Sequence, residues 1–308
     1  MQMKSEIDKL RKRIAELAQE LEHVTIMEVC GTHTASIRKY GIQELLPSNV
    51  RLVSGPGCPI CVTSQKDIAT ALAIAECDDV IFTCFGDMMR IPCGDKSLYS
   101  LYESGKHIKV IVSPLDALRI AKENPTKQVV YFGIGFETTA PLTAALIEAA
   151  DLEQLENLSV LSSHKTMPQA LIQLLAQGSN IDALICPGHV ASVTGAKLFS
   201  FVPDVLNMPA VIAGFNAYEI MTALLFIIKM LHSKNYQCVN AYPQIVTEDG
   251  NREALALLDK VFQPCDANWR GLGEIKGSGL RIRDSYANFD AALRFNISGD
   301  APVEVRGC

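Results

Sequence analysis

Two cysteines separated by two residues, Cys58 and Cys61, follow a Gly-Pro-Gly turn and constrain the fold more than any other stretch of the chain. The apolar run 50–53 before this turn is typical of a short buried strand, and the pattern of 64–75 after it predicts a helix. A Cys-x-x-Cys pair at a strand-to-helix turn lies near the amide-rich N-terminus of a helix, which favours the thiolate. Such a pair can cycle between dithiol and disulfide or hold a soft metal. The alternative is two buried structural cysteines that happen to lie three positions apart.

Composition limits the class of protein. The N-terminus carries charges and no apolar segment of the secretory type, and ten cysteines without such a segment favour a reducing compartment, so we expect a cytoplasmic protein. A net charge of −6 gives no indication of nucleic-acid binding. The longest apolar run, 220–231, is too short to span a bilayer, and we expect no membrane association.

Short apolar runs alternate with amphipathic stretches from residue 25 onward. This β-α-β-α order predicts an α/β fold of parallel sheets covered by helices. The expected strands are 25–29, 51–53, 80–85, 109–112, 129–134, 158–162, 183–186 and 211–213. The expected helices are 34–46, 64–76, 96–104, 115–122, 139–149, 167–177, 217–232 and 251–262, whereas 269–273 and 277–279 are expected to be loop.

A faint internal repeat suggests the domain organisation. Similar polar turns leave strands in both parts of the chain, which predicts two similar parallel-sheet α/β halves around a central cleft, the first of them carrying Cys30 and the Cys58/Cys61 pair. A heptad-like helix at the N-terminus packs either on the same chain or on a partner. The expected division is an N-terminal helix at 1–24 that packs with the C-terminal unit, α/β domains at 25–125 and 126–215, and a C-terminal unit at 216–308 that forms, with the helix, a third unit.

Chemically active residue types gather at the ends of the expected strands, where parallel sheets place their functional groups. Cys30 is either a core cysteine or a thiolate ligand for Fe(II) or zinc. His33 could be a ligand, a proton donor or a group that orients a ligand, and His189 is similar. Glu137 is either an acid at the site or a helix-capping group. The pair His164 and Lys165 is either an anion contact or a solvated loop.

Six motifs in register resemble the hydrogenase formation protein HypD family. They extend from about residue 24 to about residue 285 in the family's order. The motifs are Met27-Glu28-Val29-Cys30-Gly31-Thr32-His33-Thr34, Gly55-Pro56-Gly57-Cys58-Pro59-Ile60-Cys61-Val62-Thr63, Phe85-Gly86-Asp87-Met88-Met89-Arg90, Ser113-Pro114-Leu115-Asp116-Ala117-Leu118, Gly135-Phe136-Glu137-Thr138-Thr139-Ala140-Pro141 and Trp269-Arg270-Gly271-Leu272-Gly273.

This resemblance implies a cytoplasmic maturation factor for [NiFe]-hydrogenase that helps assemble the Fe(CN)2CO group. The implied partners are a HypC-type chaperone and a HypE-type cyanide donor. By position, Cys30 would hold the iron together with a cysteine of the HypC-type partner. Cys58 and Cys61 would form the redox pair beside it and belong to the iron site as well. Redox thiol chemistry without simple substrate turnover is expected, so whether the protein is an enzyme stays open.

The same resemblance places His33, Glu137 and His189 in motifs that line one cleft with the cysteines, as catalytic candidates. Two alternatives to the assembly factor remain at this point. One is a general thiol-disulfide oxidoreductase that uses the Cys-x-x-Cys pair, and the other is an iron-binding scaffold without redox cycling.

Two departures from the family pattern bear on the cofactors. Members of the family continue into a cysteine-rich C-terminal segment that binds a [4Fe-4S] cluster, but here no cysteine lies between Cys265 and Cys308, so the ligands of that cluster are not in this chain. We therefore expect either a fragment or a short homologue. In addition, Cys93 separates a proline from a glycine that are adjacent in the family, as an extra thiol or a local insertion.

Overall fold

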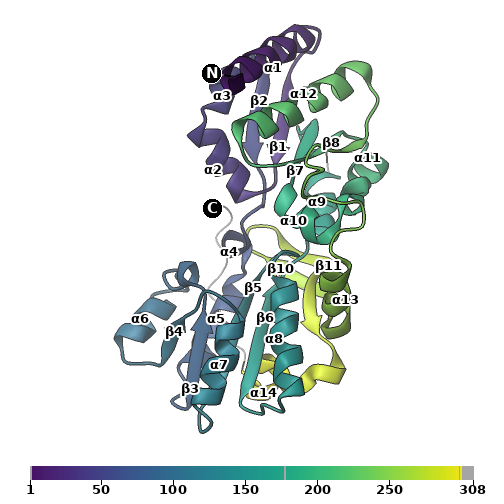
Figure 1. Ribbon diagram of the computed structural model, residues 1–308. Coiled ribbons are helices and arrows are strands. Elements are labelled where there is room, and N and C mark those ends of the chain that lie inside the picture. Colours follow the sequence, from purple (N-terminus) through teal and green to yellow (C-terminus); the bar gives the residue numbers. More distant parts are fainter. Residues whose placement is uncertain (1, 177, 298, 300–308) are drawn as a thin grey trace. The chain divides into compact units, whose positions relative to one another are not determined.

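The computed structural model describes residues 2–176, 178–297 and 299, and the chain forms two compact units (Figure 1). The first unit combines Met1–Cys58 with Ala170–Arg252, and the second combines Pro59–Gln169 with Glu253–Cys308. Each unit contains a parallel sheet with helices, as the α/β prediction requires. The chain therefore passes from one unit to the other three times, and neither unit is a continuous segment.

The first unit is built on a five-stranded sheet in the order β2-β1-β7-β8-β9, in which all neighbours are parallel. Its strands are β1 (Val24–Glu28), β2 (Val50–Ser54), β7 (Ala183–Pro187), β8 (Ala210–Ala213) and β9 (Cys238–Asn240). Its helical segments are α1 (Gln2–Ala18), α2 (Gly31–Lys39), α3 (Ile42–Leu45), α10 (Gly188–Thr194), η2 (Ala196–Ser200), α11 (Phe201–Leu206) and α12 (Ala217–Ser233). The expected single helix 34–46 is two helices, because Gly41 has φ 59° and breaks the hydrogen-bond ladder between α2 and α3.

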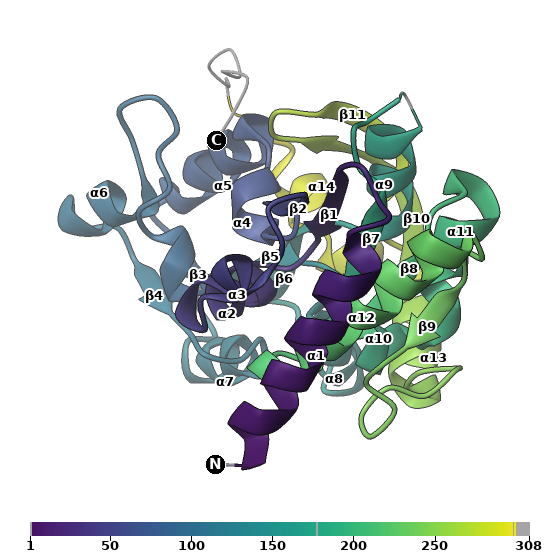
Figure 2. The ribbon, with the colours of Figure 1, turned by 90° about the horizontal axis from the view of Figure 1, so that it is seen from above.

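The N-terminal helix packs on its own chain. Figures 1 and 2 show α1 alongside α12, and the buried Ile14 and Ala18 of α1 join Ile220 and Leu224 of α12 in one core with the sheet. This apolar contact explains the narrow heptad-like seam of α1, since only one stripe of the helix faces α12.

The second unit contains a four-stranded parallel sheet in the order β4-β3-β5-β6. Alternate residues of β5 serve two cores: Val130 and Phe132 pack with α5, and Val129 and Tyr131 pack with α8. The strands are β3 (Val80–Cys84), β4 (Ile108–Val110), β5 (Gln128–Gly135) and β6 (Leu158–His164). The helical segments are α4 (Pro59–Val62), α5 (Gln65–Ala75), η1 (Gly86–Met88), α6 (Leu98–Glu103), α7 (Leu115–Glu123), α8 (Ala140–Leu152), η3 (Asp284–Phe289) and α14 (Ala291–Phe295), while α9 (Met167–Leu175) and α13 (Arg252–Val261) span the changes of unit.

A long antiparallel hairpin contains the residues that were expected to be loop, 269–273 and 277–279. It consists of β10 (Phe262–Trp269) and β11 (Gly273–Ile282). Residues 270–272 are the turn between the strands, as the loop prediction requires, whereas 277–279 lie within β11 and were wrongly expected to be loop. Gly271 and Gly273 at the turn both have φ 79°, and Gly277, at an irregularity of the ladder, has φ 65°. Packing of the fully buried Trp269 then stabilises strand geometry that the local composition does not favour.

The observed units also differ from the expected continuous domains 25–125 and 126–215. Strands β1 and β2 pair with β7, whereas β3 and β4 pair with β5 and β6, so each expected domain contributes strands to both sheets. The expected third unit is divided as well: α1 and α12 belong to the first unit, while β10, β11 and α14 belong to the second. Residue 177 of an expected helix, and residues 298 and 300–308 of the expected C-terminal unit, lie outside the described residues.

In the part of the chain that the structure describes, every helix is too short or too polar to cross a bilayer. The cytoplasmic location stays a prediction.

Candidate functional site

The C-terminal edge of the first unit's sheet collects four of the predicted site residues. Cys30 and His33 follow β1, Cys58 follows β2, and His189 follows β7 at the start of α10. The strands are parallel and β1 lies between β2 and β7, so these loops leave the sheet at one edge and are neighbours there.

The Gly-Pro-Gly turn lies directly against the backbone of Cys30. A Cβ atom at Gly57 would be 2.4 Å from the nitrogen of Cys30 and 2.5 Å from the carbonyl carbon of Val29, so only glycine permits this approach. The N–H of Gly31 also donates to the carbonyl of Gly57 at 3.4 Å. Cys58 is the next residue, and the sequence Gly-Pro-Gly-Cys therefore brings the Cys58 loop onto the Cys30 loop.

Glu28, a residue that sequence reasoning did not single out, connects the two loops. It is the last residue of β1, and it is 2% exposed. Its Oε2 accepts a hydrogen bond from the N–H of Cys30 at 3.0 Å, and its backbone carbonyl accepts one from the N–H of Gly55 at 2.8 Å. Burial raises the pKa of Glu28, and hydrogen bonds from Ser54, Thr34 and Cys30 oppose this rise. The signal in the sequence was a glutamate at the end of a mainly apolar strand.

His33 is fully buried in α2 and stacks on Phe215, which follows β8. Its Nε2 lies 2.9 Å from the carbonyl of Gly214 and must donate to it, so the neutral ring carries its lone pair on Nδ1. Burial lowers the pKa of His33 to about 4, which keeps the ring neutral at physiological pH. Among the described residues Nδ1 has no hydrogen-bond partner. His33 therefore carries a buried, unprotonated Nδ1 whose lone pair has no partner among the described residues.

His189 belongs to the same aromatic group. Its ring stacks on Phe215 with 3.9 Å between centroids, and Tyr242 contacts Phe215 edge-on. The His189 side chain is exposed, and partial burial lowers its pKa. Sequence reasoning missed Phe215, because a lone aromatic residue after a strand is more often part of a core. The structure thus brings Cys30, His33 and His189 to one edge of one sheet.

The Cys-x-x-Cys pair lies at the change between the units. Cys58 is the last residue of the segment Met1–Cys58 of the first unit, and Cys61 lies on the short helix α4 of the second unit. Cys58 is partly buried and Cys61 is exposed. The convergence of all three sulfurs on one site, and the central cleft that would hold them, stay predictions.

Glu137 lies in the second unit, just after β5. It is fully buried, and its Oε1 accepts a hydrogen bond from the N–H of Met167 at 2.8 Å. Its Oε2 has no partner among the described residues, and burial raises the pKa of Glu137 to about 7. A carboxyl group with this pKa can hold or release a proton near neutral pH.

His164 and Lys165 are not in a solvated loop, because both are almost completely buried in the second unit. The His164 ring nitrogens lie 3.1 Å from the hydroxyls of Thr143 and Ser162, and burial lowers the pKa of His164 to about 3, so it is a neutral core histidine. The Lys165 ammonium lies 3.4 Å from a carboxylate oxygen of Asp67 and 6.0 Å from the centre of the Trp269 ring.

Several other cysteines have the environment of structural thiols. Burial raises the pKa of Cys84 to about 12 and raises that of Cys186 well above its ordinary value. Cys93, the departure from the family pattern, is buried, its Sγ lies 3.6 Å from the carbonyl of Gln65, and burial raises its pKa. High thiol pKa values make these cysteines poor nucleophiles and poor ligands at neutral pH.

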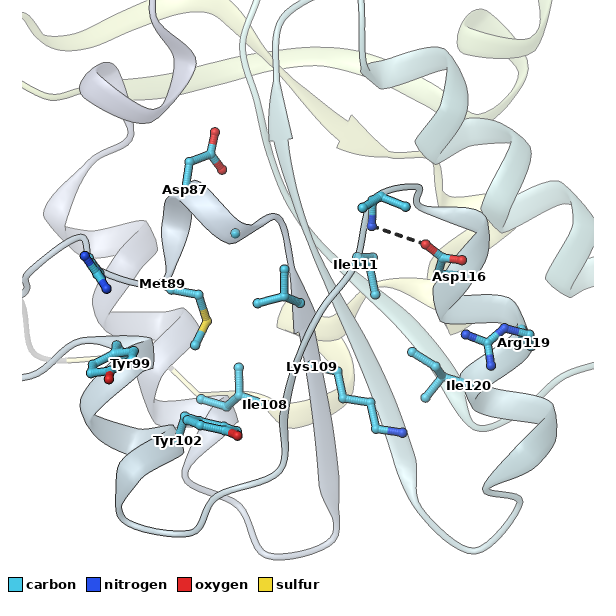
Figure 3. Close-up of a pocket in the computed structure, with 14 residues that line it drawn as sticks. Asp87, Met89, Tyr99, Tyr102, Ile108, Lys109, Ile111, Asp116, Arg119 and Ile120 are labelled. Atoms are coloured by element: carbon cyan, nitrogen blue, oxygen red, sulfur yellow. Dashed lines mark hydrogen bonds between the residues drawn. The ribbon is translucent and has the colours of Figure 1, made fainter.

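A pocket of about 890 Å³ in the second unit involves none of the predicted site residues (Figure 3). Tyr99 and Tyr102 of α6, Lys109 of β4 and Arg119 of α7 line it. Asp116 at the same pocket accepts hydrogen bonds from the N–H groups of the residues just before α7, and so it has a local capping role. The pocket and the cysteine loops are thus separate features.

Within residues 2–176, 178–297 and 299, no group of three or more His, Cys, Asp or Glu side chains is arranged to hold a metal ion. The absence of [4Fe-4S] ligands from this chain stays a prediction.

The chain is similar to known proteins over almost its whole length. The model of the HypD family, described as "Hydrogenase formation hypA family", matches residues 5–308. The Hydrogenase maturation factors HypD of Azotobacter vinelandii and of Escherichia coli (strain K12) are each 38% identical to this chain over 97% of its length. The matched regions cover 81% and 80% of those two proteins, respectively. The Hydrogenase maturation factor HypD of Rhodobacter capsulatus is 39% identical over 99% of this chain and 82% of that protein.

Proposed function

Since this chain belongs to the HypD family of hydrogenase formation proteins, we propose that it is a [NiFe]-hydrogenase maturation factor that acts as scaffold and redox partner in assembly of the Fe(CN)2CO group. The iron is the cargo in this proposal. Cys30 holds it together with a thiolate from a HypC-type chaperone, and a HypE-type protein supplies cyanide. The observation that carries the proposal is the contact of Gly57 with the Cys30 backbone, which joins the two cysteine loops.

The remaining groups have supporting roles in the proposal. Cys58 and Cys61 exchange electrons with the cargo by cycling between dithiol and disulfide. The lone pair on Nδ1 of the neutral His33 binds the iron or orients one of its ligands, and His189 covers Phe215 beside it. Glu137, with a pKa near neutrality, supplies or takes up a proton.

Anaerobic co-purification with a HypC-type partner, followed by infrared spectroscopy, tests the assembly role. We expect CN and CO bands in the wild-type complex and their loss in Cys30→Ala. Cys77→Ala is the matched control, because Cys77 is another partly buried thiol and its Sγ lies 3.7 Å from a helix carbonyl, that of Ala73. A wild-type complex without these bands, or bands that survive Cys30→Ala, would contradict the proposal.

A redox titration followed by mass spectrometry tests the Cys58/Cys61 pair. We expect a disulfide between these two residues above a defined potential. Thiols that stay reduced at every potential would favour the non-redox iron scaffold, whereas disulfide exchange with unrelated substrates would favour a general oxidoreductase.

A further inference from the structure

Glu28 is a buried carboxylate at the point where the two cysteine loops leave the sheet. Glu28 is 2% exposed, and the strand around it is mainly buried and apolar. Placing a carboxylate there is unfavourable unless its oxygens are hydrogen-bonded. An apolar residue would fill the same space at the end of β1 without this cost. The carboxylate therefore has a role other than filling the core.

The hydrogen bonds of Glu28 are directed at the cysteine loops. Oε2 accepts the N–H of Cys30, and Oε1 accepts the hydroxyl of Thr34 in α2. The Thr34 hydroxyl lies 3.3 Å from that of Ser54 at the end of β2. The backbone carbonyl of Glu28 accepts the N–H of Gly55. One residue thus fixes the start of the Cys30 loop, the first turn of α2 and the start of the Gly-Pro-Gly-Cys loop.

The side chain of Cys30 does not cap the helix that follows it. Cys30 occupies the N-cap position of α2 with extended backbone angles (φ −154°, ψ 122°), and its side chain makes no capping hydrogen bond. The conformation of the loop is therefore set through the backbone. The N–H of Cys30 donates to the carboxylate of Glu28, and the carbonyl of Cys30 accepts a hydrogen bond from the N–H of Thr34. The thiol is left available for another group.

We propose that Glu28 is a positioning residue: by accepting the Cys30 N–H it fixes the direction of the Cys30 thiol and its place beside the Cys58 loop. The step from this geometry to iron assembly rests on the function proposed above, but the effect on the thiol does not.

The test compares two substitutions of similar size in the 308-residue chain. Glu28→Gln keeps an oxygen that can accept the Cys30 N–H, whereas Glu28→Met fills the same space without an acceptor. The rate of alkylation by iodoacetamide is measured at each cysteine by peptide mass spectrometry. We expect Glu28→Met to raise the rate at Cys30 by about five-fold, the size of one lost hydrogen bond, and Glu28→Gln to stay within about two-fold of wild type.

Two controls separate positioning from charge and from general loosening. Thr34→Val removes the hydrogen bond from Thr34 to Glu28 and leaves the Cys30 contact, so the Cys30 rate should stay within about two-fold. Cys77 should react at the wild-type rate in all variants. If Glu28→Gln and Glu28→Met change the alkylation rate at Cys30 equally, the charge of Glu28 matters and its position does not. If Thr34→Val and Glu28→Met change this rate equally, the loop is loosened in general. Either result would overturn the proposal.

The infrared experiment distinguishes the two proposals. If the wild-type complex lacks CN and CO bands while Glu28→Met still changes the Cys30 rate, the assembly role fails and the positioning role stands. If the bands are present and the alkylation rates do not differ, the positioning role fails alone.

Discussion

Gly57 makes the closest backbone approach in the site, because it lies against Cys30 and Val29 with no room for a side chain. We expect Gly57→Ala to displace the loop and to lower the free energy of unfolding by about 1–3 kcal/mol. Urea denaturation followed by circular dichroism measures this change. Gly31→Ala is the control, since a Cβ there meets nothing within 4 Å, and it should be neutral or slightly stabilising. Equal destabilisation by both variants would contradict the close-approach explanation.

Glu137 gives a second prediction for a single residue, through the pH dependence of stability. Its pKa rises from 4.5 when the chain is unfolded to about 7 in the folded protein. The folded state therefore binds the proton of Glu137 more tightly than the unfolded chain does. This tighter proton binding contributes at most about 3 kcal/mol to the free energy of unfolding. The contribution is present below pH 4.5 and is lost as the pH rises through 7. We expect Glu137→Gln to be more stable relative to wild type at about pH 8 than at about pH 5.

Urea unfolding of both proteins at the two pH values measures this difference. The comparison with wild type at each pH is essential, because His33 and His164 have lowered pKa values and shift stability in the opposite direction. A difference between variant and wild type that is the same at both pH values would show that Glu137 does not titrate in this range.

At the scale of elements, one buried hydrogen bond ties the two strands of the β10–β11 hairpin together. The indole N–H of Trp269 donates to the Ser278 hydroxyl at 2.8 Å, and this hydroxyl donates to the carbonyl of Ile275 at 2.8 Å. Trp269 also stacks on Phe136 after β5, with 5.8 Å between ring centroids. The hairpin is thereby held at the C-terminal end of β5.

We expect Ser278→Ala to lower the free energy of unfolding by about 1–3 kcal/mol, because the buried indole N–H loses its acceptor. Ser285→Ala, at an exposed position of η3, should have almost no effect. Trp269→Phe combined with Ser278→Ala should cost less than the sum of the two single substitutions, because no unpaired N–H remains. Strict additivity in this cycle, measured by circular dichroism, would mean that the hydrogen bond does not couple the strands.

The whole molecule is two units that each use distant parts of the chain. Helix α12 closes the core of the first unit, and the β10–β11 hairpin closes a core of the second. A fragment of residues 25–215, the two domains expected from sequence, lacks α1, α12 and the hairpin. We expect this fragment to remain unfolded, because both cores lose a large part of their apolar contacts.

Circular dichroism and heteronuclear NMR of the fragment test this expectation, with the 308-residue chain as the reference. Dispersed amide resonances and a cooperative melting transition in the fragment would show that the continuous division 25–125 and 126–215 describes the folding units better than the discontinuous one.

Local patterns determined most of the elements and the family. Each of the eight expected strands coincides with a strand of the structure to within about two residues, because buried parallel strands are short apolar runs with clear boundaries. The cysteine and glycine motifs were sufficient to predict the family, which the comparisons confirm. They also placed Cys30, His33, Cys58 and His189 after strands, where the structure has them.

Only the tertiary structure decided which strands share a sheet, since buried strands carry almost no information about their partners. It also decided that the glycine-rich residues 273–282 form a strand. Glu28 accepts the N–H of Cys30 and Phe215 stacks on His33, and such contacts between side chains leave no local pattern in the sequence. The sequence by itself thus determined the elements and the chemical groups. Long-range packing decided their assembly, because it depends on which apolar faces meet in space.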